Sequence, residues 1–341
     1  MRYLSYRSRI RLRNGLIGGL IAILTLGVLG VCGFFYLERY IVYTPEGAHL
    51  DFSAGGDSPP NPTFQAEKPR PIPGADLVPD TGPEESQTLT RLTGYYADGE
   101  ALADPDAVRS ALENLSAPTA VMLDVRSIYG NFYYTSAQEG APTSTAVNPT
   151  AVGELIQELA GNEMIYLIAR LPAFRDPVFA LANQSCGISL PSGALWMDSA
   201  GCYWLDPADD QVIAYLEQLA RELYGLGFDE VAFDDFFVPD GAVVYYKGGA
   251  AANVTEAARR LQANLDGVKI SFVTQNANLA PYAAHIYFKE SDGAEVSGLV
   301  SLFAETETDT SLSEFLVFLT SSRDTRFEEY GVLKPIVSGG G

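Results

Sequence analysis

The sequence predicts a (β/α)8 barrel of the TIM type over residues 91–341, behind a membrane-spanning segment and a proline-rich linker. Two observations favour this fold. Short runs rich in Val, Ile, Phe and Tyr alternate with longer helical patterns, which is typical of βα units and a parallel sheet. About 250 residues follow this rhythm, the usual size of such a barrel. A doubly wound sheet would instead show a Gly-rich loop after its first strand, and none follows Tyr96 or Val125.

Seven segments have the composition of buried strands: Leu92 to Tyr96, Ala120 to Val125, Met164 to Arg170, Glu230 to Asp235, Val268 to Thr274, Gly298 to Phe303 and Val332 to Val337. An eighth strand is expected at His285 to Phe288, or else the barrel is incomplete. Helices are expected near 105–115, 149–160, 209–225, 253–265 and 311–322. The clearest begins at Asp209, carries an apolar stripe on one face and ends at Gly225.

The first ninety residues are expected to anchor the barrel to a membrane. Residues 1–14 hold five arginines and no acid, and residues 15–37 form an apolar run that is uncharged throughout. As a helix, the 22 residues from Gly15 to Tyr36 would be about 33 Å long, enough to cross a bilayer core. The positive-inside rule then places the N-terminus in the cytoplasm and the barrel outside it. A cleaved signal peptide is the alternative, but the run is long and no small-x-small cleavage site follows.

Residues 38–90 are expected to be a linker, because eight of the 20 prolines lie in 51–90 among Gly, Ser, Asp and Glu. The net charge of the chain is −21, and the residues after the first 40 hold 16 basic and 42 acidic side chains. Such a domain repels nucleic acid and anionic lipid, so neither is an expected partner.

Two cysteines, Cys186 and Cys202, lie in the part expected outside the cytoplasm. They form either a disulfide or two free thiols, and the sequence leaves both readings open. The chain has only two histidines and no CxxC motif, so we expect no metal site and no cofactor.

Polar residues recur where the predicted strands end, which is the functional end of a (β/α)8 barrel. They are Asp124, Arg170, Asp176, Trp196, Trp204, Asp206, Asp234 and Asp235. Period two puts Ala232 and Asp234 on one strand face, so we expect Asp234 to point into the barrel mouth and Asp235 toward the helices or a loop. Asp234 is the strongest candidate, because a carboxylate ending an apolar strand costs desolvation energy that structure alone seldom requires.

Acids and aromatic rings around one mouth suit carbohydrate chemistry. Glycoside cleavage uses one carboxylic acid to protonate the leaving oxygen and a second carboxylate as base or nucleophile, while aromatic faces stack on sugars. Structural roles compete at several positions. Asp206 is equally suited to turn and cap chemistry, Arg170 to neutralising nearby acids, and Glu230 to packing or solvation at the opposite end of the barrel.

Four ordered motifs carry a resemblance over residues 91 to 240. They are VMLDVRSIYGNFYY, IARLPAFRDP, LWMDSAGCYWLDP and GFDEVAFDDFFVP. In these motifs the chain resembles a bacterial glycoside hydrolase family with a (β/α)8 barrel, related in fold to amylase-like enzymes. The resemblance implies that Asp124, Arg170, Asp176, Trp204, Asp206 and Asp234 occupy characteristic family positions, with Asp234 as the carboxylate of strand four.

The chain departs from this family at two places. After Asp234 the family pattern contains an Arg that is absent here, and the next strand ends in Thr274 and Gln275 rather than near an acid. Asp234 therefore has no partner on that strand. Asp124 lies two strands away, roughly 9–10 Å, near the separation used by inverting hydrolases. Glu305, at the end of the sixth counted strand, is the other candidate, although it belongs to the charged run ETETD.

The sequence thus predicts an anchored, extracytoplasmic hydrolase of a polysaccharide or cell-surface glycan. Asp234 and either Asp124 or Glu305 would act on the bond, and Arg170, Asp176, Trp196, Trp204, Asp206 and Asp235 would bind the substrate. The alternative is a barrel without catalysis that binds a glycan or a protein partner at the cell surface.

Overall fold

The computed structural model describes residues 41–44, 47–50, 91–138, 140–289, 291–306, 308 and 310–337. The chain divides into two compact units, Met1–Thr81 and Gly82–Gly341. In the first unit the described residues form an antiparallel pair, β1 (Ile41–Thr44) and β2 (Gly47–Leu50). The predicted span 15–37 and the proline-rich stretch 51–90 lie outside the described residues. Within the described ranges, no helix combines the length and apolar character needed to cross a bilayer.

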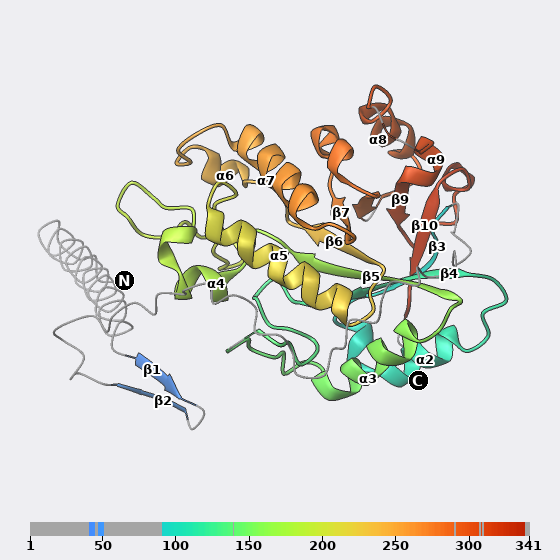
Figure 1. The fold of residues 1–341 in the computed structure, drawn as a ribbon, viewed down its shortest axis with the longest axis horizontal. Helices are drawn as coiled ribbons and strands as arrows, with labels where there is room; N and C mark the ends of the chain where they lie inside the picture. The colour runs from blue at the N-terminus through green and yellow to red at the C-terminus, as the bar shows by residue number, and fades with distance from the viewer. Residues whose placement is uncertain are drawn as a thin grey trace, which may run out of the picture. The chain divides into compact units, whose positions relative to one another are not determined.

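The second unit is a closed barrel of eight parallel strands, in the spatial order β10-β3-β4-β5-β6-β7-β8-β9 (Figure 1). The predicted fold class is therefore confirmed, and the barrel is complete. The strands are β3 (Thr93–Ala97), β4 (Thr119–Asp124), β5 (Ile165–Pro172), β6 (Glu230–Asp234), β7 (Lys269–Val273), β8 (Ile286–Lys289), β9 (Leu316–Leu319) and β10 (Gly331–Pro335).

Helices connect most of these strands and pack on the outside of the barrel, as α3, α5 and α7 show in Figure 1. The α-helices are α2 (Pro105–Leu112), α3 (Pro149–Ala160), α4 (Pro177–Ala182), α5 (Asp210–Gly225), α6 (Asp240–Val243), α7 (Ala250–Asn264), α8 (Val296–Leu302) and α9 (Leu312–Phe315). Short 3-10 helices occupy Ala101–Ala103, Gln184–Cys186, Ala277–Tyr282 and Thr325–Phe327. At the start of α5 the Asp209 carboxylate accepts the Gln211 N–H at 2.8 Å, the cap that the sequence predicts there.

Six of the seven predicted strands are confirmed, and the eighth is β8, at the segment proposed for it. Two predictions are wrong. Gly298 to Phe303 lies in and just after α8 rather than in a strand, and 311–322 contains the single turn α9 followed by β9. Both errors concern short apolar runs, which periodicity alone cannot assign to a strand or a buried helix.

The core has two layers. One fills the space between barrel and helices, and the other fills the barrel interior with residues that include Met122, Ile168 and Ala232. Because Ala232 faces inward, alternation also turns Glu230 and Asp234 inward, at opposite ends of β6.

Glu230 is fully buried at the N-terminal end of the barrel interior. Of the two structural roles expected for it, packing is therefore confirmed and solvation is wrong. Its carboxylate accepts hydrogen bonds from the phenols of Tyr166 at 2.8 Å and Tyr287 at 2.7 Å, and pairs with His285 Nδ1 at 2.8 Å. Burial opposes ionisation of Glu230, but His285, Ser271 and Tyr287 outweigh it and hold the pKa of the carboxyl at about 2.

Candidate active site

A pocket of about 530 Å³ opens at the C-terminal ends of the strands, where function resides in (β/α)8 barrels. Strands β4, β5, β6 and β8 each contribute a charged residue to it, and the loop after β4 forms one wall. The lining residues are Asp124, Arg126, Ser127, Ile128, Tyr129, Asn131, Tyr133, Ser144, Ala146, Arg170, Leu171, Pro172, Arg175, Asp234, Asp235 and Lys289. Asp124, Arg170, Asp234 and Asp235 are the predicted site residues that the fold brings together here.

Asp124 and Arg170 face each other on the adjacent strands β4 and β5, where they are register partners. Arg170 Nε lies 2.5 Å from Asp124 Oδ1, and Nη2 lies 2.8 Å from Oδ2, a bidentate pair that is mostly buried. Burial works against the guanidinium charge, but the Asp124 carboxylate raises the pKa of Arg170 well above its usual range. Burial also raises the pKa of the Asp124 carboxyl, against the effect of Arg170. Both readings of Arg170, neutralising an acid and lining the site, therefore apply.

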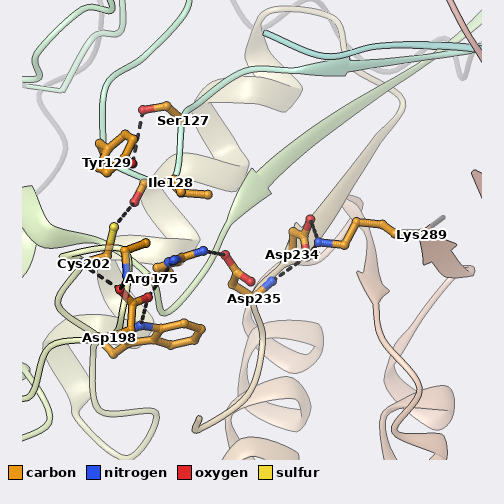
Figure 2. A network of polar contacts seen from close by, with 11 residues as sticks. Ser127, Ile128, Tyr129, Arg175, Asp198, Cys202, Asp234, Asp235 and Lys289 are labelled. Carbon is orange, nitrogen blue, oxygen red and sulfur yellow. Dashed lines mark hydrogen bonds and ion pairs between the residues drawn. The ribbon is translucent and has the colours of Figure 1, made fainter.

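Asp234 is the last residue of β6 and is neutralised by Lys289, the last residue of β8. The Lys289 ammonium reaches both carboxylate oxygens, at 2.9 and 2.8 Å (Figure 2). The Asp234 side chain is 14% exposed and that of Lys289 44% exposed, so the ammonium can move aside more easily than the carboxylate. Asp234 Oδ1 also accepts the backbone N–H of Asp235 at 2.8 Å.

Asp235, a predicted substrate-binding residue, lines the pocket, and its side chain lies beside Arg175 on a loop rather than against the helices. Among the described residues it is the only one other than glycine with a positive φ, 48°. This left-handed backbone breaks the alternation of the strand and turns the side chain toward Arg175, as Figure 2 shows. Burial first, and then the charge of Asp234, raise the pKa of the Asp235 carboxyl to about 6.

Arg175 links the pocket to the long loop after α4. Its Nη2 pairs with Asp198 at 2.7 Å, and its Nη1 lies 3.8 Å from Asp235 Oδ2. Trp204 lies beneath this group, donating Nε1–H to Asp198 at 2.9 Å and carrying the Arg175 guanidinium over its ring. Because Trp204 is 3% exposed, its predicted role as a sugar platform is wrong, and it instead supports Arg175.

Asp176 is fully buried beneath the pocket, so its predicted contact with substrate is also wrong. Its carboxylate forms an ion pair with the buried Arg126, accepts the Tyr215 hydroxyl at 2.9 Å and caps α4 by accepting the Phe179 N–H at 2.9 Å. These contacts satisfy both carboxylate oxygens within the protein.

The other three predicted residues lie outside the lining of the pocket. Asp206 accepts the Tyr246 hydroxyl at 2.7 Å and the Ala208 N–H at 2.8 Å, as its turn reading predicts. Trp196 is half-buried, and its ring lies close to Gly241. Glu305 is exposed in the turn after α8 and does not end a strand, so the placement that made it a candidate is wrong.

Both cysteines are free and buried, which favours the thiol reading. Cys186 Sγ contacts Gln211 Oε1 at 3.6 Å, and Cys202 Sγ contacts the Ile128 carbonyl at 3.4 Å. In the described part of the chain, no group of three His, Cys, Asp or Glu side chains is arranged to hold a metal ion.

Sequence reasoning missed Lys289, Arg175 and Tyr133 as pocket residues. Lys289 had a readable signal, because it directly follows the segment proposed as the eighth strand. Arg175 lies beyond the end of β5, and Tyr133 belongs to a loop that folds back over the mouth. Neither position follows from periodicity.

Residues 94–286 match a protein-family model that bears the description "Putative glycosyl hydrolase domain". This match covers more than half of the chain. It includes β4 to β7, β3 from its second residue on, and every charged residue of the pocket except Lys289. None of the curated proteins matches the chain.

Three solved structures with a similar fold are distant from this chain in sequence. A hypothetical protein from Ruminiclostridium thermocellum is 22% identical, with 52% of this chain and 96% of that chain covered and a TM-score of 0.44. The glycoside hydrolase domain of PelA from Pseudomonas aeruginosa is 15% identical, with 72% and 94% covered and a TM-score of 0.43. The PgaB (BpsB) glycoside hydrolase domain from Bordetella bronchiseptica is 12% identical, with 67% and 84% covered and a TM-score of 0.46.

Proposed function

We propose, since the chain belongs to the family of this glycosyl hydrolase domain, that the pocket at the barrel mouth binds a glycan and hydrolyses it. The observation that carries the proposal is the convergence of Asp124, Asp234 and Asp235 on one open pocket of about 530 Å³. Three carboxylates are costly to gather in one place, and glycoside hydrolysis requires at least two.

Asp234 and Asp124 are the proposed pair of reacting carboxylates. Strand β5 lies between β4 and β6, so two strand spacings separate the two residues, roughly 9–10 Å. This separation is near the range of about 6.5–9.5 Å that leaves room for a water molecule in an inverting hydrolase. Asp124 is ion-paired to Arg170 and Asp234 to Lys289. One of the two groups would protonate the leaving oxygen, and the other would activate the water molecule.

A binding module without catalysis is the second candidate. The same ion pairs support it, because Arg170 contacts both oxygens of Asp124 and Lys289 contacts both oxygens of Asp234. The pocket would then recognise sugar hydroxyls through these paired charges, with Tyr129 and Tyr133 as aromatic neighbours.

Measuring glycan hydrolysis and glycan binding by wild type and Asp234→Asn distinguishes these two functions. We expect the wild-type protein to release reducing ends from at least one polysaccharide in a panel of bacterial and environmental glycans. Asp234→Asn should lose this activity by about 10²–10⁴-fold while it still binds the glycan. The control is Asp240→Asn, an exposed carboxylate after the same strand, which should keep full activity. If wild type binds a glycan without cleaving it, the binding module is correct.

We also propose that residues 15–37 anchor the protein in the membrane, with the N-terminus in the cytoplasm and the barrel on the outer side. The uncharged run and the five preceding arginines support this proposal. Protease added to intact cells should then remove the barrel domain and leave a membrane-bound N-terminal fragment. Resistance of the barrel in intact cells, with digestion only after lysis, would contradict this orientation.

A further inference from the structure

We infer that Asp235 is the proton donor of the glycan hydrolysis proposed above. This assignment rests on the proposed function. It gives the role of proton donor to Asp235 instead of Asp124 or Glu305. It follows from the different surroundings of the three carboxylates in the pocket.

Asp124 and Asp234 are poorly placed to carry a proton. Arg170 donates to both oxygens of Asp124, and the Lys289 ammonium contacts both oxygens of Asp234. The backbone N–H of Asp235 adds a further donor to Asp234. A carboxylate that is held by N–H donors at both oxygens is better suited to accept a proton from water than to hold one for the leaving group, because each oxygen keeps a second lone pair.

Asp235 has none of these donors. Its one cationic neighbour within 4 Å among the described residues is Arg175 Nη1, at 3.8 Å, and no hydrogen bond to its carboxylate occurs within the described ranges. Arg175 is held elsewhere, because its Nη2 pairs with Asp198 at 2.7 Å. The Asp235 side chain is only 14% exposed, so water replaces few of the missing donors.

The backbone at Asp235 supports a functional reading. A left-handed conformation is uncommon for a residue with a Cβ, although Asp and Asn adopt it more readily than most, and such backbones often occur at functional sites. Phe236 directly after it is buried, as is Val238, whereas Phe237 between them is exposed, so Phe236 and Val238 tie the turn to the core. Strand alternation would point the Asp235 carboxyl group outward, and the left-handed backbone turns it into the pocket instead.

The charged groups facing Asp235 fit an acid that keeps its proton up to about pH 6. Asp234 on the same strand and Asp198 on the loop disfavour its anion, whereas Arg175 and Lys289 favour it. Together with burial they raise the pKa of Asp235 to about 6. Two groups with opposite protonation in one site are the arrangement that acid–base catalysis of glycoside cleavage requires.

The reaction balances with these roles. Asp235 gives its proton to the glycosidic oxygen as the bond from that oxygen to the anomeric carbon breaks. A water molecule attacks the anomeric carbon and gives its proton to the carboxylate of Asp234 or Asp124. The products are two hydroxyl groups, and one proton returns to Asp235 through solvent.

The test compares leaving groups in Asp235→Asn. Asn tolerates the left-handed backbone, so this variant keeps the turn and removes only the acid. Phenyl glycosides need a proton on the departing oxygen, whereas 2,4-dinitrophenyl glycosides do not. Both glycosides carry a sugar from a glycan that wild type hydrolyses. We expect kcat/KM of the variant to fall about 10²–10⁴-fold on the phenyl glycoside and less than 10-fold on the dinitrophenyl glycoside. Asp240→Asn should leave both rates unchanged.

The outcomes distinguish this inference from the proposed function. An equal loss on both leaving groups, or none on either, overturns the role of Asp235 while hydrolysis stands. Wild type that cleaves no glycoside and no polysaccharide overturns both. As a second measurement, carbon-13 NMR of the aspartate carboxyls should show one group titrating near pH 6 that disappears in Asp235→Asn. Titration of that group near pH 4 would contradict the inference even if activity falls.

Discussion

Replacement of Asp176 by Asn should unfold the domain more easily rather than weaken glycan binding directly. The Asp176 and Arg126 side chains are 0% and 1% exposed, so their ion pair is as buried as any in the described part of the chain. Asn keeps an acceptor for the Phe179 N–H that caps α4 but leaves the Arg126 guanidinium without its counter-charge. Losing one partner of a buried pair typically costs about 3–5 kcal/mol. For a domain of this size, that corresponds to a fall of about 6–20 °C in Tm.

Urea unfolding followed by circular dichroism measures this cost. The matched control is Asp106→Asn, because Asp106 pairs with Arg109 at 2.7 Å on the surface, where its own side chain is 90% exposed. Loss of that exposed pair should cost less than about 1 kcal/mol. The reasoning is refuted if Asp176→Asn unfolds like wild type but no longer binds glycan, since Asp176 would then be a binding residue.

Three further predictions concern titration and charge. Asp235→Asn should raise the free energy of unfolding at pH 7 by up to about 3 kcal/mol. The folded-state pKa of about 6 lies above the unfolded value, so ionisation of Asp235 costs wild type stability as pH rises from about 4 to 6. A lower free energy of unfolding for the variant in urea melts at pH 7 would contradict this. Glu230→Gln should lower the free energy of unfolding at neutral pH. Wild type loses stability below pH 4.5 because the folded-state pKa of Glu230 is about 2, and this loss should be smaller in the variant. Urea melts of both proteins at pH 3 and 7 measure the difference, and an equal loss of stability in the two proteins would contradict the prediction. Lys289→Met should lower kcat/KM for glycan hydrolysis by about 10-fold or more, because the ammonium that contacts both oxygens of Asp234 no longer holds this carboxylate in position. An unchanged kcat/KM would argue against a role of this pair in catalysis.

Much of the fold could be predicted from local patterns. The strands β3 to β7 and β10, and the helices that precede β4 to β7, have the periodicity and caps that define them in sequence. Where the pattern is weak, prediction failed. The segment between β7 and β8 holds only a 3-10 helix, so β8 stayed uncertain. The run FLVFL at 315–319 is apolar at every position and shows neither period, so β9 was mistaken for helix.

The site was predictable only as far as strand ends determine it. Asp124 and Asp234 end β4 and β6, and strand alternation points both inward. The predictions for Trp204 and Asp176 were wrong because the loop after β5 folds back and buries both side chains through contacts between residues distant in sequence. The orientation of Asp235 does not follow from alternation, because a single left-handed residue reverses the direction that alternation assigns to its side chain.

Hydrolysis in water enriched with oxygen-18 tests the central claim most directly, because it follows the bond and the water together. Mass spectrometry of oligosaccharides released by the wild-type protein should show one oxygen-18 atom at each new reducing end. Asp234→Asn should release almost none of these products. Products without the label, or equal labelled product from Asp234→Asn, would contradict hydrolysis by the carboxylates at the barrel mouth.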